Sequence, residues 1–268
     1  MIASLVNGVP GDQVSILDRG LQFGDGLFET LAVKDGIPCL WKRHMARLAA
    51  GCARLGIAAP EPGLLQEESR QLIGDERQAA LKITLTRGRS ERGYAPADVA
   101  PTRILSLFPW DGPGHSGLTV AIASRRLGVN PDLAGLKHLN RLEQVLARRE
   151  QPPGVRESIM FDINGHLVEG IAANIFLQQG ERLLTPRLDE NGVTGVVREL
   201  VMDLARDMGQ PVEEGRLGHQ DLLRAQAIYF SSSLLGIRPV ASIPGQDWQP
   251  VTNMHPVLEA AGRQVFTP

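Results

Sequence analysis

The sequence of 268 residues contains only two cysteines, Cys39 and Cys52. Two thiols cannot build a disulfide framework or a four-thiolate zinc site, so neither kind of fold is expected. Long apolar runs are also missing, and none approaches the roughly 20 residues that a membrane-spanning helix needs. The first residues lack a charged start followed by a long apolar stretch. We therefore expect no export signal and a cytoplasmic protein.

An excess of charge of either sign is absent as well. The chain has 28 basic and 30 acidic residues, which leaves a net charge of −2. Proteins that bind nucleic acids or anionic membranes by electrostatic attraction normally carry a clear basic excess. We therefore expect no nucleic-acid partner and no membrane partner. The length, with 43% hydrophobic residues, is sufficient for one or two globular domains.

Several common catalytic motifs do not occur in the sequence. No G-x-G-x-x-G segment follows a predicted strand, and there is neither a P-loop nor a G-x-S-x-G nucleophile elbow. The six histidines show no H-E-x-x-H or other metal-binding spacing. These absences leave dinucleotide binding, P-loop chemistry and serine hydrolysis without support, and we expect no metal site.

Lysine is scarce, and this limits the candidates for amine chemistry to four residues. Lys34 adjoins a predicted turn, Lys42 stands at a predicted helix start, and Lys82 alternates with apolar residues in a predicted strand. Lys137 differs because it lies where a glycine-containing loop enters a helix, with leucines on both sides. Such surroundings favour the neutral amine that Schiff-base chemistry needs. The alternative for Lys137 is an ordinary surface lysine.

The first part of the chain shows the pattern of β-hairpins followed by helices. Asn7-Gly8 and Asp35-Gly36 lie between short apolar runs, which is typical of hairpin turns. The spacing of apolar residues predicts a helix that begins near Lys42 and ends at Gly56. A second helix follows Pro62, and two strands come after it.

The segment of residues 110–117, WDGPGHSG, is rich in glycine and proline and interrupts the periodic pattern. We place a domain boundary there, which gives domains of residues 1–110 and 111–268. The second domain also begins with a strand and continues through a helix, a strand meander and another helix. Strands followed by helices twice over favour an α+β protein of two domains.

Three further features could bind a cofactor or substrate. Glu169 follows a predicted hairpin strand, and its carboxylate is either exposed or paired with a buried cation such as a pyridinium nitrogen. Gly195 opens a predicted helix, whose first N–H groups could hold a phosphate together with Arg47 and the serines 231–233, unless it is only a turn. The arginine-rich loop with Arg92 and Tyr94 either binds carboxylates or is solvated.

The order of these features resembles the fold-type IV pyridoxal-phosphate enzymes, the family of branched-chain and D-amino-acid aminotransferases. The matching stretches extend over nearly the whole chain: DRGLQFGDGLFET (18–30), HMARL (44–48), RGYAP (92–96), NPDLAGLKHLNRLEQVLAR (130–148), EGIAANIF (169–176) and TPRLDENGVTGVVRE (185–199). The run around Lys137 is similar to the 4-amino-4-deoxychorismate lyase branch, in which KHLNRLEQ occurs where aminotransferases diverge.

The resemblance implies a small N-terminal α/β domain, a larger C-terminal pseudo-barrel domain and a homodimer. It implies pyridoxal 5′-phosphate as cofactor, bound covalently by Lys137 and through its pyridine nitrogen by Glu169. The residues implied to hold the cofactor phosphate are Arg47, Val196 and Val197 through their backbone N–H groups, and Ser233. Aminotransferase relatives often have a threonine where Val197 stands, so one phosphate contact is missing here.

The resemblance also implies a reaction, in which 4-amino-4-deoxychorismate yields 4-aminobenzoate and pyruvate for folate synthesis. Lys137 would be the general base, Thr30 would relay a proton, and Asn140 would orient the region around Lys137. The residues expected to bind the two substrate carboxylates are Arg92, Tyr94 and Arg141. The alternatives are a D-amino-acid or branched-chain transaminase of the same fold and a non-catalytic binding protein.

Overall fold

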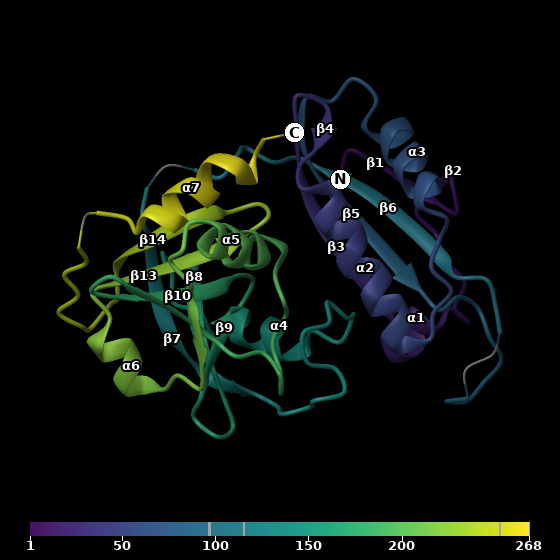
Figure 1. The fold of residues 1–268 in the computed structure, drawn as a ribbon. Helices are drawn as coiled ribbons and strands as arrows, with labels where there is room; N and C mark the ends of the chain where they lie inside the picture. The colour runs from purple at the N-terminus through teal and green to yellow at the C-terminus, as the bar shows by residue number, and fades with distance from the viewer. Residues whose placement is uncertain (96–97, 115, 252, 268) are drawn as a thin grey trace. The chain divides into compact units, whose positions relative to one another are not determined.

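The computed structural model describes residues 1–95, 98–114, 116–251 and 253–267 (Figure 1). It divides into two compact units, and each contains one sheet with its own helices, which confirms the α+β prediction. Unit 1 comprises Met1–Gly112, Lys137–Asn140 and the C-terminal residues from Phe266, and unit 2 comprises Pro113–Leu136 and Arg141–Val265. Relative to the predicted domains 1–110 and 111–268, unit 1 thus gains the segment that contains Lys137.

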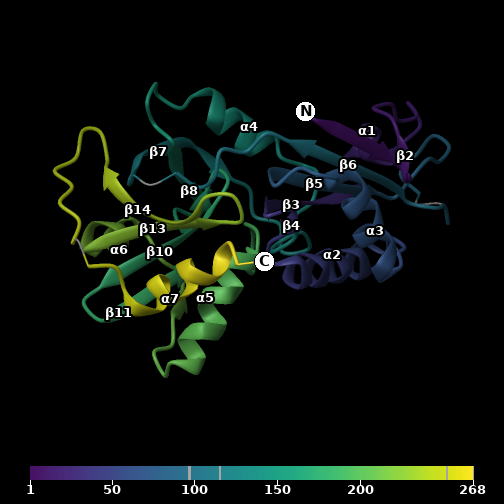
Figure 2. The ribbon, with the colours of Figure 1, turned by 90° about the horizontal axis from the view of Figure 1, so that it is seen from above.

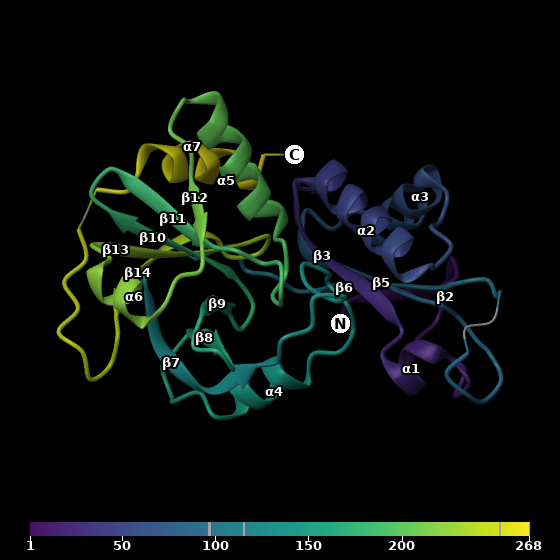
Figure 3. The ribbon, with the colours of Figure 1, turned by 60° about the horizontal axis from the view of Figure 1, so that its bottom comes forward.

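Unit 1 is built on an antiparallel sheet of six strands in the order β2-β1-β6-β5-β3-β4. Helices α2 and α3 lie along one face of this sheet (Figure 3). The strands are β1 (Ala3–Val6), β2 (Val9–Pro10), β3 (Gly26–Lys34), β4 (Ile37–Pro38), β5 (Gln78–Thr86) and β6 (Thr102–Phe108), and the helices are α1 (Arg19–Phe23), α2 (Trp41–Leu55) and α3 (Pro62–Ile73).

The predicted hairpin turns and the first long helix are confirmed. Asn7-Gly8 and Asp35-Gly36 have positive φ at both residues, which is the geometry that type I′ turns require. Helix α2 ends at Gly56, whose φ of 61° is left-handed. The helix-covered face of the sheet carries fully buried side chains, such as Leu31 and Ile83. Successive side chains along these strands therefore alternate between this buried face and a half-exposed face.

Unit 2 is built on a mixed sheet of eight strands in the order β12-β11-β10-β13-β14-β7-β8-β9. The sheet curls, so that β9 at one edge also contacts β10 (Figure 3). Helices α5 and α7 pack side by side against it (Figure 2). The strands are β7 (Leu118–Leu127), β8 (Glu157–Asp162), β9 (Leu167–Gly170), β10 (Asn174–Gln179), β11 (Arg182–Pro186), β12 (Glu213–Gly215), β13 (Ala227–Ser232) and β14 (Gly236–Ser242), and the helices are α4 (Leu142–Arg149), α5 (Val196–Asp207), α6 (His219–Arg224) and α7 (Pro256–Val265).

The curl gives unit 2 a continuous apolar interior. Val120, Ile175 and Phe230 come from three different strands and are each completely buried in one cluster. Burying a side chain of this size contributes roughly 1.5–3 kcal/mol. The loops at the ends of these strands are thus attached to a rigid support. No helix in the described part of the chain is long and apolar enough to cross a membrane.

Gly26 at the start of β3 offers a test of how tightly the unit 1 sheet is packed. A Cβ there would lie 2.5 Å from the backbone oxygen of Leu85 and 2.9 Å from the Cα of Thr86. We expect Gly26→Ala to destabilise the protein by about 1–3 kcal/mol in urea unfolding, because backbone atoms of β5 must move. Gly262→Ala is the control, since open space surrounds Gly262 in α7. It should stabilise by about 0.5–1 kcal/mol, and equal effects of the two changes would contradict the packing.

Candidate active site

Lys137 lies in a short extended segment that pairs with the beginning of β3. The N–H of Phe28 donates to the Lys137 carbonyl at 2.9 Å, and the N–H of Leu139 donates to the Gly26 carbonyl at 3.0 Å. Leu27 and His138 form an antiparallel bridge between these two bonds. The segment continues the sheet beyond the short strand β4, which pairs only with the far end of β3. The Lys137 backbone is therefore fixed by the sheet.

The Lys137 side chain lies over the ring of Phe28, with Nζ 4.4 Å from the ring centroid. Thr30 follows two residues later on β3 and therefore points to the same face of the sheet. Thr30 is half-buried on this face. The structure thus places Thr30, the predicted proton relay, and Phe28, which the predicted base Lys137 contacts, on one face of β3.

Asn140 and Arg141 both make structural contacts near Lys137. Asn140 donates through Nδ2 to the Gly24 carbonyl at 3.2 Å. Gly24 has a left-handed φ of 67°, and a Cβ there would lie 2.4 Å from Asn140 Oδ1. The Arg141 guanidinium donates to the Leu136 carbonyl at 2.9 Å and so closes the loop around the lysine. Both side chains therefore shape the Lys137 segment, and their cofactor and substrate roles stay predictions.

Arg47 belongs to a buried charge cluster with Glu29 and His44. Its Nε donates to Glu29 Oε1 at 2.8 Å, a second guanidinium nitrogen contacts Oε2, and His44 Nδ1 lies 2.6 Å from Oε2. Burial favours the neutral acid, but hydrogen bonds from Arg47 and His44 outweigh it and lower the pKa of Glu29 to about 2. Burial lowers the pKa of His44. Since an ionised carboxylate can only accept hydrogen bonds, neutral His44 donates one to Glu29 through Nδ1–H.

The sequence did not single out His44 or assign Glu29 a role. The available signal was the spacing of the buried α2 residues His44, Leu48 and Cys52, which places a polar ring on the apolar face of the helix. A histidine at such a position needs a partner, but sequence spacing does not tell which one. The partner lies on β3, the same strand that carries Phe28 and Thr30.

Arg92 and Tyr94 lie in a loop whose backbone is held by Arg19. The buried Arg19 guanidinium donates to the carbonyls of Gly93 at 2.9 Å, Tyr94 at 3.0 Å and Ala95 at 3.3 Å. The Arg92 side chain is exposed, and that of Tyr94 is 85% exposed. The loop therefore has a fixed course, while its two predicted substrate-binding side chains point into solvent.

Glu169 in unit 2 is a buried carboxylate at the end of β9. Its Oε2 accepts from the N–H of Val193 at 2.9 Å and from Asn174 Nδ2 at 3.5 Å. Asn174 also donates to the Val193 carbonyl at 2.8 Å, so it joins the carboxylate to the loop before α5. Gly135, two residues before Lys137, is paired with the same loop through bonds of 3.0 Å to Gly192 and Thr194.

The N-terminus of α5 is suited to an anion. Gly195 is its N-cap, and no described side chain caps the helix. A Cβ on Gly195 would lie 1.9 Å from Asn174 Oδ1, so only glycine fits between them. Val196 and Val197 begin the helix, and their N–H groups have no acceptor within it. Such a terminus attracts phosphate by its N–H groups and its dipole.

A serine-containing strand end adjoins this helix terminus. In the sheet, Ser231 lies directly opposite Asn174, whose side chain contacts Gly195. The Ser231 hydroxyl is buried and has no hydrogen-bond partner among the residues that the structure describes. Ser233 follows two residues later, in the turn between β13 and β14. The N–H groups and hydroxyls together fit a phosphate group.

Comparison with known proteins shows to which family the chain belongs. The model of the amino-transferase class IV family matches residues 26–243. The chain belongs to this family. An aminodeoxychorismate lyase of Vibrio harveyi is 34% identical over 89% of this chain and 90% of its own length. A crystal structure of 4-amino-4-deoxychorismate lyase from Pseudomonas aeruginosa has a TM-score of 0.89 and 38% identity, over 97% of this chain and 98% of that one.

Aminotransferases are also similar to the chain. A putative branched-chain-amino-acid aminotransferase of Methanocaldococcus jannaschii is 31% identical over 87% of this chain and 84% of its own length. Family membership confirms the predicted D-amino-acid aminotransferase-like fold, and it supports an enzyme over a non-catalytic binding protein. The cofactor of this family is pyridoxal 5′-phosphate, as predicted. The α5 terminus and the buried Ser231 hydroxyl fit its phosphate.

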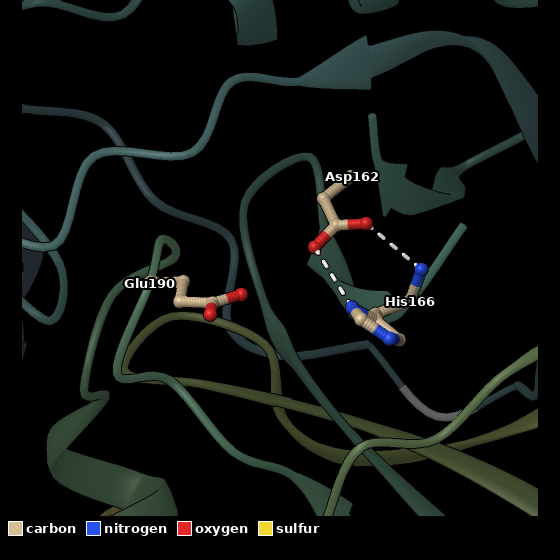
Figure 4. Close-up of side chains that lie close together, drawn as sticks. All are labelled: Asp162, His166 and Glu190. Atoms are coloured by element: carbon tan, nitrogen blue, oxygen red, sulfur yellow. Dashed lines mark hydrogen bonds and ion pairs between the residues drawn. The ribbon is translucent and has the colours of Figure 1, made fainter. Parts of the chain in front are cut away.

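A cluster of Asp162, His166 and Glu190 has the donor types of a metal site but is explained by protein contacts (Figure 4). Asp162 Oδ1 accepts from the N–H groups of Asn164 and His166 at 2.9 and 2.8 Å, which closes the turn between β8 and β9. Its other oxygen lies 3.4 Å from His166 Nδ1. Glu190 pairs with Arg216 at 3.1 Å. We therefore assign the cluster to turn stabilisation.

The buried charge cluster predicts how stability depends on pH. We expect Glu29→Gln to lower the free energy of unfolding at pH 7 by roughly 3–5 kcal/mol, because Arg47 loses its buried counter-charge. The pKa of Glu29 is lowered from 4.5 to about 2, so its contribution is complete above pH 4.5 and is lost as the pH falls through 2. Urea unfolding at several pH values should therefore show the deficit of the variant shrinking below pH 4.5.

Glu67→Gln is the matched control for this measurement. Glu67 pairs with Arg70 in a fully exposed salt bridge on α3. Exposed pairs contribute little to stability, so the unfolding midpoint of this variant should stay that of the wild type. A pH-independent deficit of Glu29→Gln would show that the carboxylate is not the charged member of the cluster.

Proposed function

We propose that this protein is an aminodeoxychorismate lyase, which converts 4-amino-4-deoxychorismate to 4-aminobenzoate and pyruvate in folate synthesis. The observation that carries the proposal is its similarity to two lyases over nearly the full length of all three chains. The site agrees with it, because the lysine in the lyase-like run KHLNRLEQ is fixed against β3 beside Thr30. The proposal includes a location in the cytoplasm.

The reaction needs one proton removed from carbon 4 and one proton given to the departing group. Bound pyridoxal phosphate supplies a sink for the electron pair of the broken C–H bond. Lys137 removes the proton from carbon 4, and Glu169 keeps the pyridine nitrogen protonated. The bond between carbon 3 and the enolpyruvyl oxygen breaks, the ring becomes aromatic, and Thr30 relays a proton to the enol. No oxidant or reductant is consumed.

The phosphate end of the cofactor is assigned to the residues described above. The N–H groups of Val196 and Val197 and the hydroxyl of Ser233 would hold it, with Arg47 as the cation. The cluster with Glu29 sets the orientation of the Arg47 guanidinium, since two of its nitrogens contact one carboxylate. Because the Arg47 side chain is already ordered, it loses little conformational entropy when the phosphate binds.

The proposal includes a homodimer, and the surface of unit 1 supports it. Ile16, Leu21 and Tyr94 are 79%, 63% and 85% exposed. Exposed apolar side chains mark a contact surface where they form one contiguous patch. A second copy would cover them, and the fixed loop would present Arg92 and Tyr94 to the site of that copy.

The competing function is amino transfer by the same fold. Two aminotransferases support it: the relative from Methanocaldococcus jannaschii and a D-alanine aminotransferase of Bacillus licheniformis, which is 28% identical over 87% of this chain. Incubation of the purified protein with aminodeoxychorismate separates the two. We expect release of 4-aminobenzoate and pyruvate in equal amounts. Amino transfer to 2-oxoglutarate without 4-aminobenzoate would establish the transaminase instead.

Lys137→Ala tests the assignment of the base. We expect turnover to fall by roughly 10⁴-fold or more, because both covalent attachment of the cofactor and proton removal are lost. The visible absorbance of lysine-bound cofactor should disappear, while the unfolding midpoint stays close to that of the wild type. Lys42→Ala is the control, since Lys42 is an exposed lysine on α2. Wild-type turnover in Lys137→Ala would discard the mechanism.

Glu169→Gln tests the carboxylate at the pyridine nitrogen. The amide oxygen can still accept from the Val193 N–H, so we expect the fold and cofactor binding to persist. Turnover should fall by about 100-fold, because a neutral amide does not keep the nitrogen protonated. Glu181→Gln is the control, as Glu181 is exposed in the same unit. Equal rates of Glu169→Gln and the wild type would make Glu169 a purely structural residue.

A further inference from the structure

Lys82 lies in the middle of β5, on the half-exposed face of the unit 1 sheet. The register pairs it with Thr30 on one side and with Ser106 on the other. Its chain neighbours Leu81 and Ile83 are completely buried on the opposite, helix-covered face. Two hydroxyl-bearing residues thus flank a half-buried lysine on the face that carries the predicted proton relay.

Lys82 and Lys137 share one aromatic ring. Lys82 Nζ lies 5.3 Å from the centroid of the Phe28 ring, and Lys137 Nζ lies 4.4 Å from the same point. The two nitrogens can therefore be no farther apart than the sum of these distances. A substrate that contains one small ring is therefore long enough to reach from the Lys137 amine to the Lys82 amine.

Among the residues that the structure describes, no carboxylate neutralises the charge of Lys82. Its ammonium group instead lies over the ring of Phe28. Four arginines of unit 1 with restricted access to water are paired: Arg19 and Arg87 with Asp25, Arg47 with Glu29, and Arg103 with Glu68. Lysine is uncommon inside strands, and a half-buried charge without a counter-ion is costly. Such a position is expected where an anion from outside the chain supplies the missing charge.

We propose that Lys82 binds a carboxylate of the substrate, with the Thr30 and Ser106 hydroxyls beside it. The proposal rests on the lyase function above, whose substrate carries two carboxylates and an amine on carbon 4, from which Lys137 would remove the proton. An ammonium group recognises a carboxylate as a point charge and needs no bidentate geometry. The site lies within unit 1 and is additional to Arg92, Tyr94 and Arg141.

The test compares Lys82→Met, which keeps the length of the side chain, with Lys82→Arg, which keeps the charge. We expect Lys82→Met to raise KM for aminodeoxychorismate by about 10- to 100-fold, the effect of losing one charged hydrogen bond. Its kcat should change less than threefold, and Lys82→Arg should recover most of the affinity. Lys34→Met is the control, since Lys34 is exposed at the end of β3.

Equilibrium titrations of the cofactor-loaded protein provide a measurement without turnover. Binding of 4-aminobenzoate measures recognition of the carboxylate on the substrate ring. Binding of pyruvate measures recognition of the carboxylate on the enolpyruvyl side chain. Weaker binding of either acid to Lys82→Met supports the proposal and tells which group is held, while the uncharged 4-aminobenzamide should bind both proteins equally. Equal binding of both acids, or a loss in kcat with unchanged KM, would overturn it.

The same titrations separate this proposal from the proposed function. If the wild type releases no 4-aminobenzoate, the lyase function fails, and 2-oxoglutarate, the acceptor of the competing reaction, becomes the carboxylate probe. Weaker binding of 2-oxoglutarate to Lys82→Met would then still support a carboxylate site at Lys82. Unchanged binding of all three acids would remove the site whatever the reaction is.

Discussion

Two backbone hydrogen bonds, between Phe28 and Lys137 and between Leu139 and Gly26, are the constraint on which the candidate site depends. They attach a loop lysine to the edge of a sheet whose strands also carry Thr30 and Lys82. A lysine on a free loop would sample many rotamers and backbone states, whereas a paired strand restricts it to a few. The backbone of Lys137 is thus positioned by main-chain hydrogen bonds, and side chains on β3 and β5 surround it.

The opposite faces of β3 have different electrostatic roles. On the helix-covered face, the ionised Glu29 accepts hydrogen bonds from Arg47 and His44 and fixes the orientation of the Arg47 guanidinium. On the half-exposed face, Lys82 has an aromatic contact and hydroxyl neighbours. Because successive residues of a strand point to opposite sides, β3 separates the buried carboxylate that orients Arg47 from the face on which Lys82 lies.

Much of this protein could be predicted from its sequence, for identifiable reasons. The hairpins at Asn7-Gly8 and Asp35-Gly36 follow from residues that tolerate positive φ, and α2 follows from its apolar spacing and its terminal glycine. The fold and the cofactor followed from stretches that resemble a family over the whole chain. The roles assigned to Lys137 and Glu169 came from the same source and await the experiments above.

Other features depend on contacts between residues far apart in the chain. Predicting that Glu29 pairs with His44, or that Lys82 lies near Lys137, requires knowing which strands are neighbours and which face the helices cover. The sequence placed Lys82 correctly in a strand but could not tell that Lys82 and Lys137 both contact the ring of Phe28. Nor did it show that residues 137–140 would group with the first unit, since that follows from a pairing across more than a hundred residues.

The hydrogen bonds from Arg19 to the loop of residues 93–95 all go to main-chain oxygens. Carbonyl groups are the same whatever side chains they carry, so the course of the loop is encoded in α1, outside the loop itself. Outside Gly93, whose φ of 119° favours glycine, mutation can therefore exchange the side chains of the loop and leave these hydrogen bonds in place. The side chains of the loop can thus vary more freely than its path.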